Sequence, residues 1–155
     1  MYTFNLKKGV KFPDGTPFNG AAVKFTFDRV VDPATKAGQS HDQLGPYDHT
    51  DVVDDYTVKV VMKQPYAPLL ADLAKYPIVS PTAVKRWGAA FKDHPIGTGP
   101  FKFVSWKPGE QLVVRRFEGY WGTAPALERV VCHVVVDARQ LLLEPESDSV
   151  VLAAW

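Results

Sequence analysis

A glycine-rich turn that leads directly into a strand pattern constrains the fold of this chain more than any other stretch. Residues 95–106 read PIGTGPFKFVSW, and the turn consists of Gly97, Thr98, Gly99 and Pro100. Glycine takes backbone angles that other residues avoid, and proline fixes one angle and removes a hydrogen-bond donor. The chain must change direction here. We expect a crossing point between two structural units, with mixed strands and helices before it and mainly strands after it.

The composition allows one hydrophobic core and excludes several classes of protein. The chain has 155 residues, of which 46% are hydrophobic, and a formal net charge of +1. It has no run of lysine or arginine typical of a nucleic-acid-binding surface, so we expect no nucleic-acid partner. The single cysteine, Cys132, excludes an internal disulfide and a cysteine-based zinc site. Its position in an apolar strand pattern predicts a buried, inert thiol.

The N-terminal residues show no targeting segment. Residues 2–7 alternate apolar and polar side chains, which predicts a half-buried strand at the start of the chain. They lack the charged and apolar regions of a signal peptide, and no apolar run of the sequence is long enough to cross a bilayer. We therefore expect a soluble chain without an export signal of its own. The abrupt start also suggests a partial chain.

The sequence before the glycine turn predicts a helix between two strands. Asn19 is a good N-cap, and Val23, Phe27 and Val30 follow on one helical face. Asp32-Pro33 ends this helix. The remaining expected elements are a polar loop over 33–51, a strand over 56–63 and short helices over 68–75, with Leu69, Leu70 and Leu73 on one face, and 82–87.

The sequence after the turn predicts mainly strands. A hairpin is expected from 101–106 and 112–117, because the sequence between them, KPGE, has Pro and Gly at the type II turn positions. Residues 128–137 are apolar at both alternating sets of positions, so we expect a strand that is covered on both faces. A short helix over 141–143 and a last strand over 150–155 are predicted beyond it.

The sequence contains no catalytic motif. Gly97-Thr98-Gly99 begins like a dinucleotide fingerprint, but a strand follows it where that motif requires a helix. No nucleophile and base stand out, so an enzymatic function has no positive support. The loop with His41, His49 and Asp51 contains residue types that bind divalent metals, although an ordinary solvated loop explains it better. The aromatic residues at strand ends and turns are interpreted as packing residues that are also able to stack on a ligand: Trp87, Trp106, Tyr120 and Trp121.

Several motifs in order resemble family 5 of the bacterial extracellular solute-binding proteins, the oligopeptide, dipeptide and nickel receptors of ABC transporters. The segments that carry the resemblance are YTFNLKKGVKFPDGTPFNGAAVKFTFDRVVDP (2–33), VDDYTVKVVMKQPYAPLLADLA (53–74), VSPTAV (79–84), PIGTGPFKFVSWKPGEQLVVRRFEGYWG (95–122) and LERVVCHVVVDA (127–138). Each motif alone is modest, but the ordered set is specific.

The resemblance implies a receptor without covalent chemistry and without a cofactor. Such proteins are bilobed, close on a peptide or similar small solute, and deliver it to a membrane permease. They are periplasmic or extracellular and membrane-associated. The fold implied is a mixed α/β fragment of a type II periplasmic-binding-protein-like fold.

The resemblance also implies a division of the chain. Residues 1–94 are similar to part of an extra subdomain of the first lobe, and residues 95–137 to the start of the return into the main lobe. Residues 138–155 depart from the family pattern, because EPES interrupts the expected helix, and we expect an atypical tail, that of a fragment or of a decayed gene. Members of the family are much longer than this chain, so we expect part of a receptor that exposes apolar strand faces and self-associates.

Ligand contacts are expected near residues 39–47, the loop that faces the cleft in peptide receptors of this family. The candidates are Gln39, Ser40, His41, Gln43 and Tyr47. Their polar character fits hydrogen bonding to a peptide backbone, and it fits an ordinary surface loop equally well. Two other functions stay open: a structural module that binds nothing, and a metal-binding domain that uses the 41–51 loop.

Overall fold

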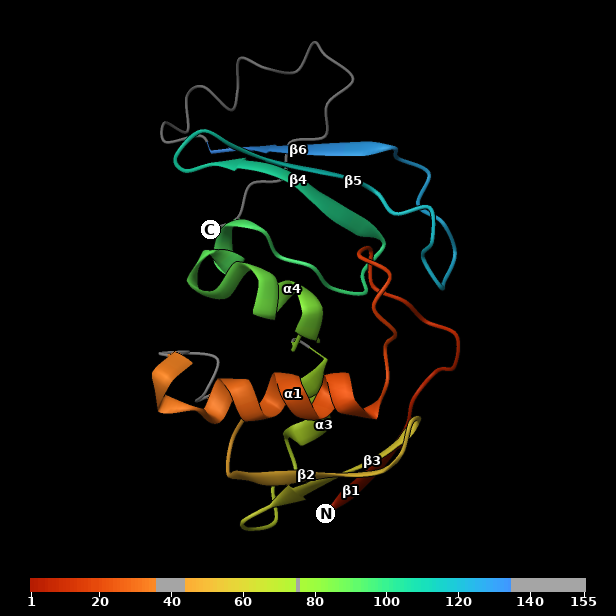
Figure 1. Cartoon of the computed structure of the whole chain (residues 1–155), viewed down its shortest axis with the longest axis vertical. Helices are drawn as coiled ribbons and strands as arrows, with labels where there is room; N and C mark the ends of the chain where they lie inside the picture. The colour runs from red at the N-terminus through yellow and green to blue at the C-terminus, as the bar shows by residue number, and fades with distance from the viewer. Residues whose placement is uncertain (36–43, 75, 135–155) are drawn as a thin grey trace.

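Two three-stranded sheets lie at opposite ends of the molecule, with helices between them (Figure 1). The computed structural model describes residues 1–35, 44–74 and 76–134. Within these ranges no helix combines the length and the apolar character needed to span a membrane. The predicted elements at 141–143 and 150–155 lie outside the described residues.

The first sheet is antiparallel and has the order β1-β3-β2. Its strands are β1 (Tyr2–Asn5), β2 (Tyr47–Asp54) and β3 (Thr57–Met62). The central strand β3 alternates buried and half-buried positions, with Val58 and Val60 fully buried. The predictions of strands over 2–7 and 56–63 are confirmed, with somewhat shorter bounds.

Helix α1 (Gly20–Val31) covers the inner face of this sheet (Figure 1). The Asn19 side chain accepts a hydrogen bond from the backbone N–H of Ala22 at 3.1 Å, as the predicted N-cap requires. The helix ends at Asp32, before Pro33, as predicted. Its apolar face and the sheet form one core cluster: Val23, Phe27, Leu44, Tyr47, Val58, Val60, Met62 and Leu69.

The predicted loop over 33–51 is wrong at its C-terminal end, because β2 begins at Tyr47. A 3₁₀ helix, η1 (Pro33–Thr35), also lies within it. The polar residues of β2 conceal the strand, and its pairing with β3 is irregular between Tyr47 and His49 and again between Val52 and Asp54. A bulge breaks the alternation of buried and exposed positions on which a sequence-based strand assignment depends.

The short helices α3 (Leu69–Leu73) and α4 (Pro81–Trp87) confirm the two predictions for this region. The predicted apolar face of α3 is partly wrong: Leu69 is fully buried, whereas Leu70 is 60% exposed. Leu69 and Leu73, at i and i+4, share a face, whereas Leu70 lies about 100° around the helix from Leu69. A 3₁₀ helix, η2 (Gly88–Asp93), continues from α4 towards the glycine turn.

The second sheet is antiparallel and has the order β4-β5-β6. Its strands are β4 (Phe101–Lys107), β5 (Gln111–Arg116) and β6 (Arg129–His133). The predicted hairpin is confirmed, and Gly109 has the positive φ of 74° that a type II turn requires.

The second sheet buries far less than the first. Val113 is the only buried hydrophobic residue in the described strands of this sheet. The predictions that β6 is covered on both faces and that the Cys132 thiol is buried are therefore wrong, since Cys132 is exposed. The expected bare apolar surface is present at Val134, which is 53% exposed. Self-association stays a prediction.

The glycines of the central turn are not where the backbone needs glycine most. Neither Gly97 nor Gly99 has a positive φ, so the sequence argument from unusual backbone angles is wrong here. A Cβ atom at Gly99 would have nothing within 4 Å. At Gly20, by contrast, a Cβ would lie 2.9 Å from a methyl group of Val52 and 3.0 Å from the carbonyl oxygen of Asp54. The close approach of α1 to β2 is the real constraint.

We predict that Gly20→Ala destabilises the chain by about 1–3 kcal/mol, because the added methyl group overpacks the contact between α1 and β2. Gly99→Ala is the matched control, and its effect is expected to stay within about 0.5 kcal/mol. Urea unfolding followed by circular dichroism measures both. An equal loss of unfolding free energy in Gly20→Ala and Gly99→Ala would contradict this explanation.

Candidate functional site

Tyr47, one of the expected ligand contacts, is part of the core. Its side chain is 4% exposed, and its ring packs edge-on against Phe27 at 5.8 Å between centroids. The hydroxyl donates to Asp28 Oδ1 at 3.1 Å and shares a hydrogen bond of 2.9 Å with Thr50 Oγ1. Burial, together with the charge of Asp28, raises the pKa of Tyr47 well above its usual range, so the phenol stays neutral. Tyr47 thus joins β2 to α1.

The other expected contacts, Gln39, Ser40, His41 and Gln43, lie outside the described residues. Their role therefore stays a prediction. The chain segment that follows them is firmly held, because Leu44 is fully buried and Gly45 has a φ of 65°.

The ring of Tyr66 packs against Gly45 in this segment, a contact that the sequence did not predict. A Cβ at Gly45 would lie 2.7 Å from the Tyr66 ring, so only glycine fits there. The Tyr66 hydroxyl donates to Asp72 Oδ2 at 2.7 Å. The backbone carbonyl of Tyr66 accepts from the Tyr2 hydroxyl at 2.7 Å. The sequence signal is a tyrosine directly after Pro65, where the strand ends.

Tyr76 packs against the same residue of α1 as Tyr47 does. Its ring lies 5.8 Å from that of Phe27. Burial raises the pKa of Tyr76 to about 12, although the charge of Arg29 acts in the other direction. Tyr47 and Tyr76 are therefore neutral groups that pack against Phe27 of α1.

The described residues give the metal hypothesis no support. His49 Nδ1 lies 2.9 Å from Asp48 Oδ2, and His49 Nε2 lies 3.6 Å from Asp51 Oδ1. These contacts form one exposed chain of partners along β2, and no cluster of three or more metal-binding side chains occurs in the part of the chain that the structure describes. His41 lies outside that part.

The glycine turn connects the two halves of the structure through backbone hydrogen bonds. Ser80 N–H donates to the Ile96 carbonyl at 3.0 Å, and Phe117 N–H donates to the Pro100 carbonyl at 2.8 Å. On one side of the turn lies the extended segment before α4, and on the other the second sheet. That the turn is a crossing point between two structural units stays a prediction.

Trp121 fastens the turn to the N-terminal part of the chain. Its indole N–H donates to the Thr98 carbonyl at 3.0 Å. The Lys7 ammonium lies 4.6 Å from the centre of the indole ring and donates to the Trp121 carbonyl at 3.3 Å. These contacts hold the Trp121 ring in place, although the residue is 46% exposed, so its role as a packing residue stays an interpretation.

A hollow of about 320 Å³ lies between α4 and β4, beside the turn. Trp87 and His94 form part of its lining and stack at 3.8 Å between ring centroids. Arg86, Lys102 and Phe103 are also among the lining residues, so the surface is mixed polar and apolar. Small-molecule sites have volumes in this range.

Asp14 and Ser80 form a polar contact at the edge of this hollow. The Ser80 hydroxyl donates to Asp14 Oδ2 at 2.5 Å and accepts from the Ala83 N–H, which caps α4. Partial burial raises the pKa of Asp14, but the hydrogen bonds from Ser80 and Thr16 outweigh this, and the net direction is downward. The Asp14 carboxylate therefore stays charged at neutral pH. It binds the start of α4 to the turn around residues 13–16.

We predict that Ser80→Ala destabilises the chain at pH 7 by about 1 kcal/mol through the lost cap, with a further loss through Asp14. A lowered carboxyl pKa adds stability above the unfolded value of about 3.9, and this part disappears as the pH falls through the folded value. The difference in the free energy of unfolding between Ser80→Ala and wild type should therefore be smaller at pH 3 than at pH 7. Urea unfolding at both pH values measures it.

Ser105→Ala, on an exposed position of β4, is the control and should behave like wild type. If Ser80→Ala loses the same unfolding free energy at pH 3 as at pH 7, the contact with Asp14 does not contribute to stability.

The family assignment follows from comparison with known proteins. Residues 1–154 match the family described as "Bacterial extracellular solute-binding proteins, family 5 Middle". The chain belongs to this family, and its mixed α/β architecture is part of the type II periplasmic-binding-protein fold. The resemblance inferred from the sequence motifs is confirmed.

Several relatives are similar over most of this chain. The glutathione-binding protein GsiB of Pectobacterium atrosepticum is 39% identical over 140 residues, which are 88% of this chain and 27% of that protein. GsiB of Escherichia coli O157:H7 is 36% identical over the same share. The chain thus spans little more than a quarter of the length of these curated relatives.

Solved structures agree with this assignment. NikA from Brucella suis, in complex with Fe(III)-EDTA, has a TM-score of 0.74 and 34% identity, covering 90% of this chain and 28% of NikA. DppA from Helicobacter pylori, in complex with the peptide STSA, has a TM-score of 0.76 and 28% identity, covering 92% of this chain and 32% of DppA.

Proposed function

We propose that the chain serves as part of the solute-binding component of a bacterial ABC importer, located outside the cytoplasmic membrane. The family match over residues 1–154 carries this proposal. The function is binding and delivery to a membrane permease, with no covalent chemistry. The helix-covered first sheet supports it, because a binding surface needs a rigid scaffold beneath it.

The ligand class that we propose is a short peptide or a similar small solute. Relatives named for glutathione and a structure holding a tetrapeptide support this class. Both ligands offer backbone amides and carboxylates to polar side chains. Gln39, Ser40, His41 and Gln43 remain the proposed direct contacts, and Tyr47 acts from the core by holding the start of β2.

We further infer that residues 1–94 form one unit, that 95–137 begin a second, and that 138–155 are an atypical tail. The support for the first boundary is the change from the first sheet to the second at the glycine turn. The bare second sheet also favours one alternative function, an interaction module that binds protein and no solute.

We predict weak binding of the peptide Ser-Thr-Ser-Ala and of glutathione, with Kd values of about 1 mM, because this chain supplies only part of a cleft. Saturation-transfer NMR detects such binding. The variant Gln39→Ala/Ser40→Ala/Gln43→Ala should lose most of the transfer. The control Gln64→Ala/Ser105→Ala/Thr123→Ala, which changes three exposed polar residues elsewhere, should keep it. Equal transfer in both variants, or none with wild type, would overturn the proposal.

The metal alternative has its own test. Titration of wild type and of His41→Ala/His49→Ala with Ni²⁺ should show no difference in binding if the loop is an ordinary polar loop. A loss of tight Ni²⁺ binding in the variant would favour the metal function instead.

A further inference from the structure

Three cationic residues lie in one row across the second sheet. The pairing of β4 with β5 places Lys102 directly opposite Arg115, and the pairing of β5 with β6 places Arg115 directly opposite Arg129. All three side chains are exposed. Directly opposed residues of a sheet point to the same face, so the three charges lie side by side. Like charges in this arrangement destabilise a sheet.

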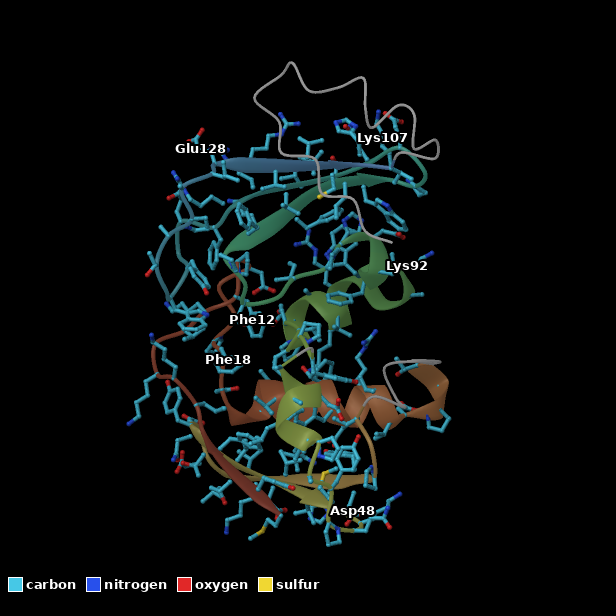
Figure 2. All side chains as sticks on the ribbon, turned by 180° about the vertical axis from the view of Figure 1, so that it is seen from behind. Phe12, Phe18, Asp48, Lys92, Lys107 and Glu128 are labelled. Atoms are coloured by element: carbon cyan, nitrogen blue, oxygen red, sulfur yellow. The ribbon has the colours of Figure 1, made fainter. Side chains whose placement is uncertain are left out.

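The nearby carboxylates do not neutralise this row. Arg116, the neighbour of Arg115, points to the opposite face of the sheet. It is Arg116 that contacts Glu118 at 3.3 Å and Glu128 at 3.9 Å. Among the described residues, no ion pair includes any member of the row. Figure 2 labels Glu128 at one end of the sheet and Lys107 at the other; the row lies at the Glu128 end, because Arg129 follows Glu128 in sequence.

The spacing of the row fits carboxylates on a helix. Neighbouring strands are about 4.8 Å apart, so the three residues span about 10 Å. On a helix, residues at i, i+3 or i+4, and i+7 lie on one face, and i to i+7 spans about 10.5 Å. Alternate residues of a strand are about 6.6 Å apart, so three of them span about 13 Å and fit less well.

We propose that the row of Lys102, Arg115 and Arg129 is a docking site for an acidic helix of a partner protein, with carboxylates at i, i+4 and i+7. Each arginine offers a planar fork that matches a carboxylate, and Lys102 adds a mobile point charge at the β4 edge. None of these three residues is among the proposed solute contacts at 39–47, so the proposal does not depend on solute binding.

The test is fluorescence anisotropy of the full 155-residue chain with a labelled, alanine-rich helical peptide that carries Glu at i, i+4 and i+7. We expect saturable binding that weakens as salt rises. The variant Lys102→Gln/Arg115→Gln/Arg129→Gln should bind about tenfold more weakly, the sum of three exposed ion pairs. The control Lys63→Gln/Lys85→Gln/Lys92→Gln removes the same charge from other exposed positions and should bind within about twofold of wild type.

Folding of the row variant is checked by its thermal midpoint, which should be no lower than that of wild type because like-charge repulsion is removed. Three results would overturn the proposal: equal weakening in the control variant, equal binding of a peptide with Glu at i, i+2 and i+5, or tighter binding of inorganic polyphosphate than of the helical peptide.

Discussion

The packing of α1 against the first sheet is the interaction on which the rest of the structure depends. Phe27 lies between Tyr47 and Tyr76, and Val58 and Val60 are fully buried beneath the helix. Fully burying one such side chain contributes about 1.5–3 kcal/mol, so this cluster is a large source of hydrophobic stabilisation among the described residues. The tight contact at Gly20 exists because helix and sheet approach closely.

The two halves of the structure are joined by polar contacts between residues far apart in the sequence. Lys7 reaches Trp121, which in turn holds the glycine turn at Thr98, and Ser80 reaches Asp14 within the first half. The second sheet contributes little burial to this junction. The geometry at the hollow beside the turn therefore depends on a few hydrogen bonds that single substitutions can remove.

Local signals in the sequence predicted the elements whose patterns are strict. The Asn19 cap with its apolar face predicted α1, the alternation in β3 predicted that strand, and Pro108-Gly109 predicted the hairpin. The predictions that were wrong concern features that depend on tertiary contacts. Bulges and polar residues concealed β2, and the steric demand on glycine lies at Gly20 because of a neighbouring strand.

The functional features also differ in how far the sequence predicts them. The family was predictable from ordered motifs, because these span most of the chain. The burial of Tyr47 was not, since Tyr47 lies in a stretch that reads as a polar loop. The cation row of the second sheet was not predictable either: its members are widely separated in sequence, and only the strand register brings them together.

Amide hydrogen exchange tests the central claim, that the first sheet and α1 hold the core while the second sheet has none of comparable size. The account predicts the slowest exchange at Val58, Val60 and the middle of α1, close to the rate of global unfolding. Amides of β5 and β6 should exchange at least about tenfold faster through local opening. Equal protection in the two sheets, or slower exchange in β6 than in β3, would contradict it.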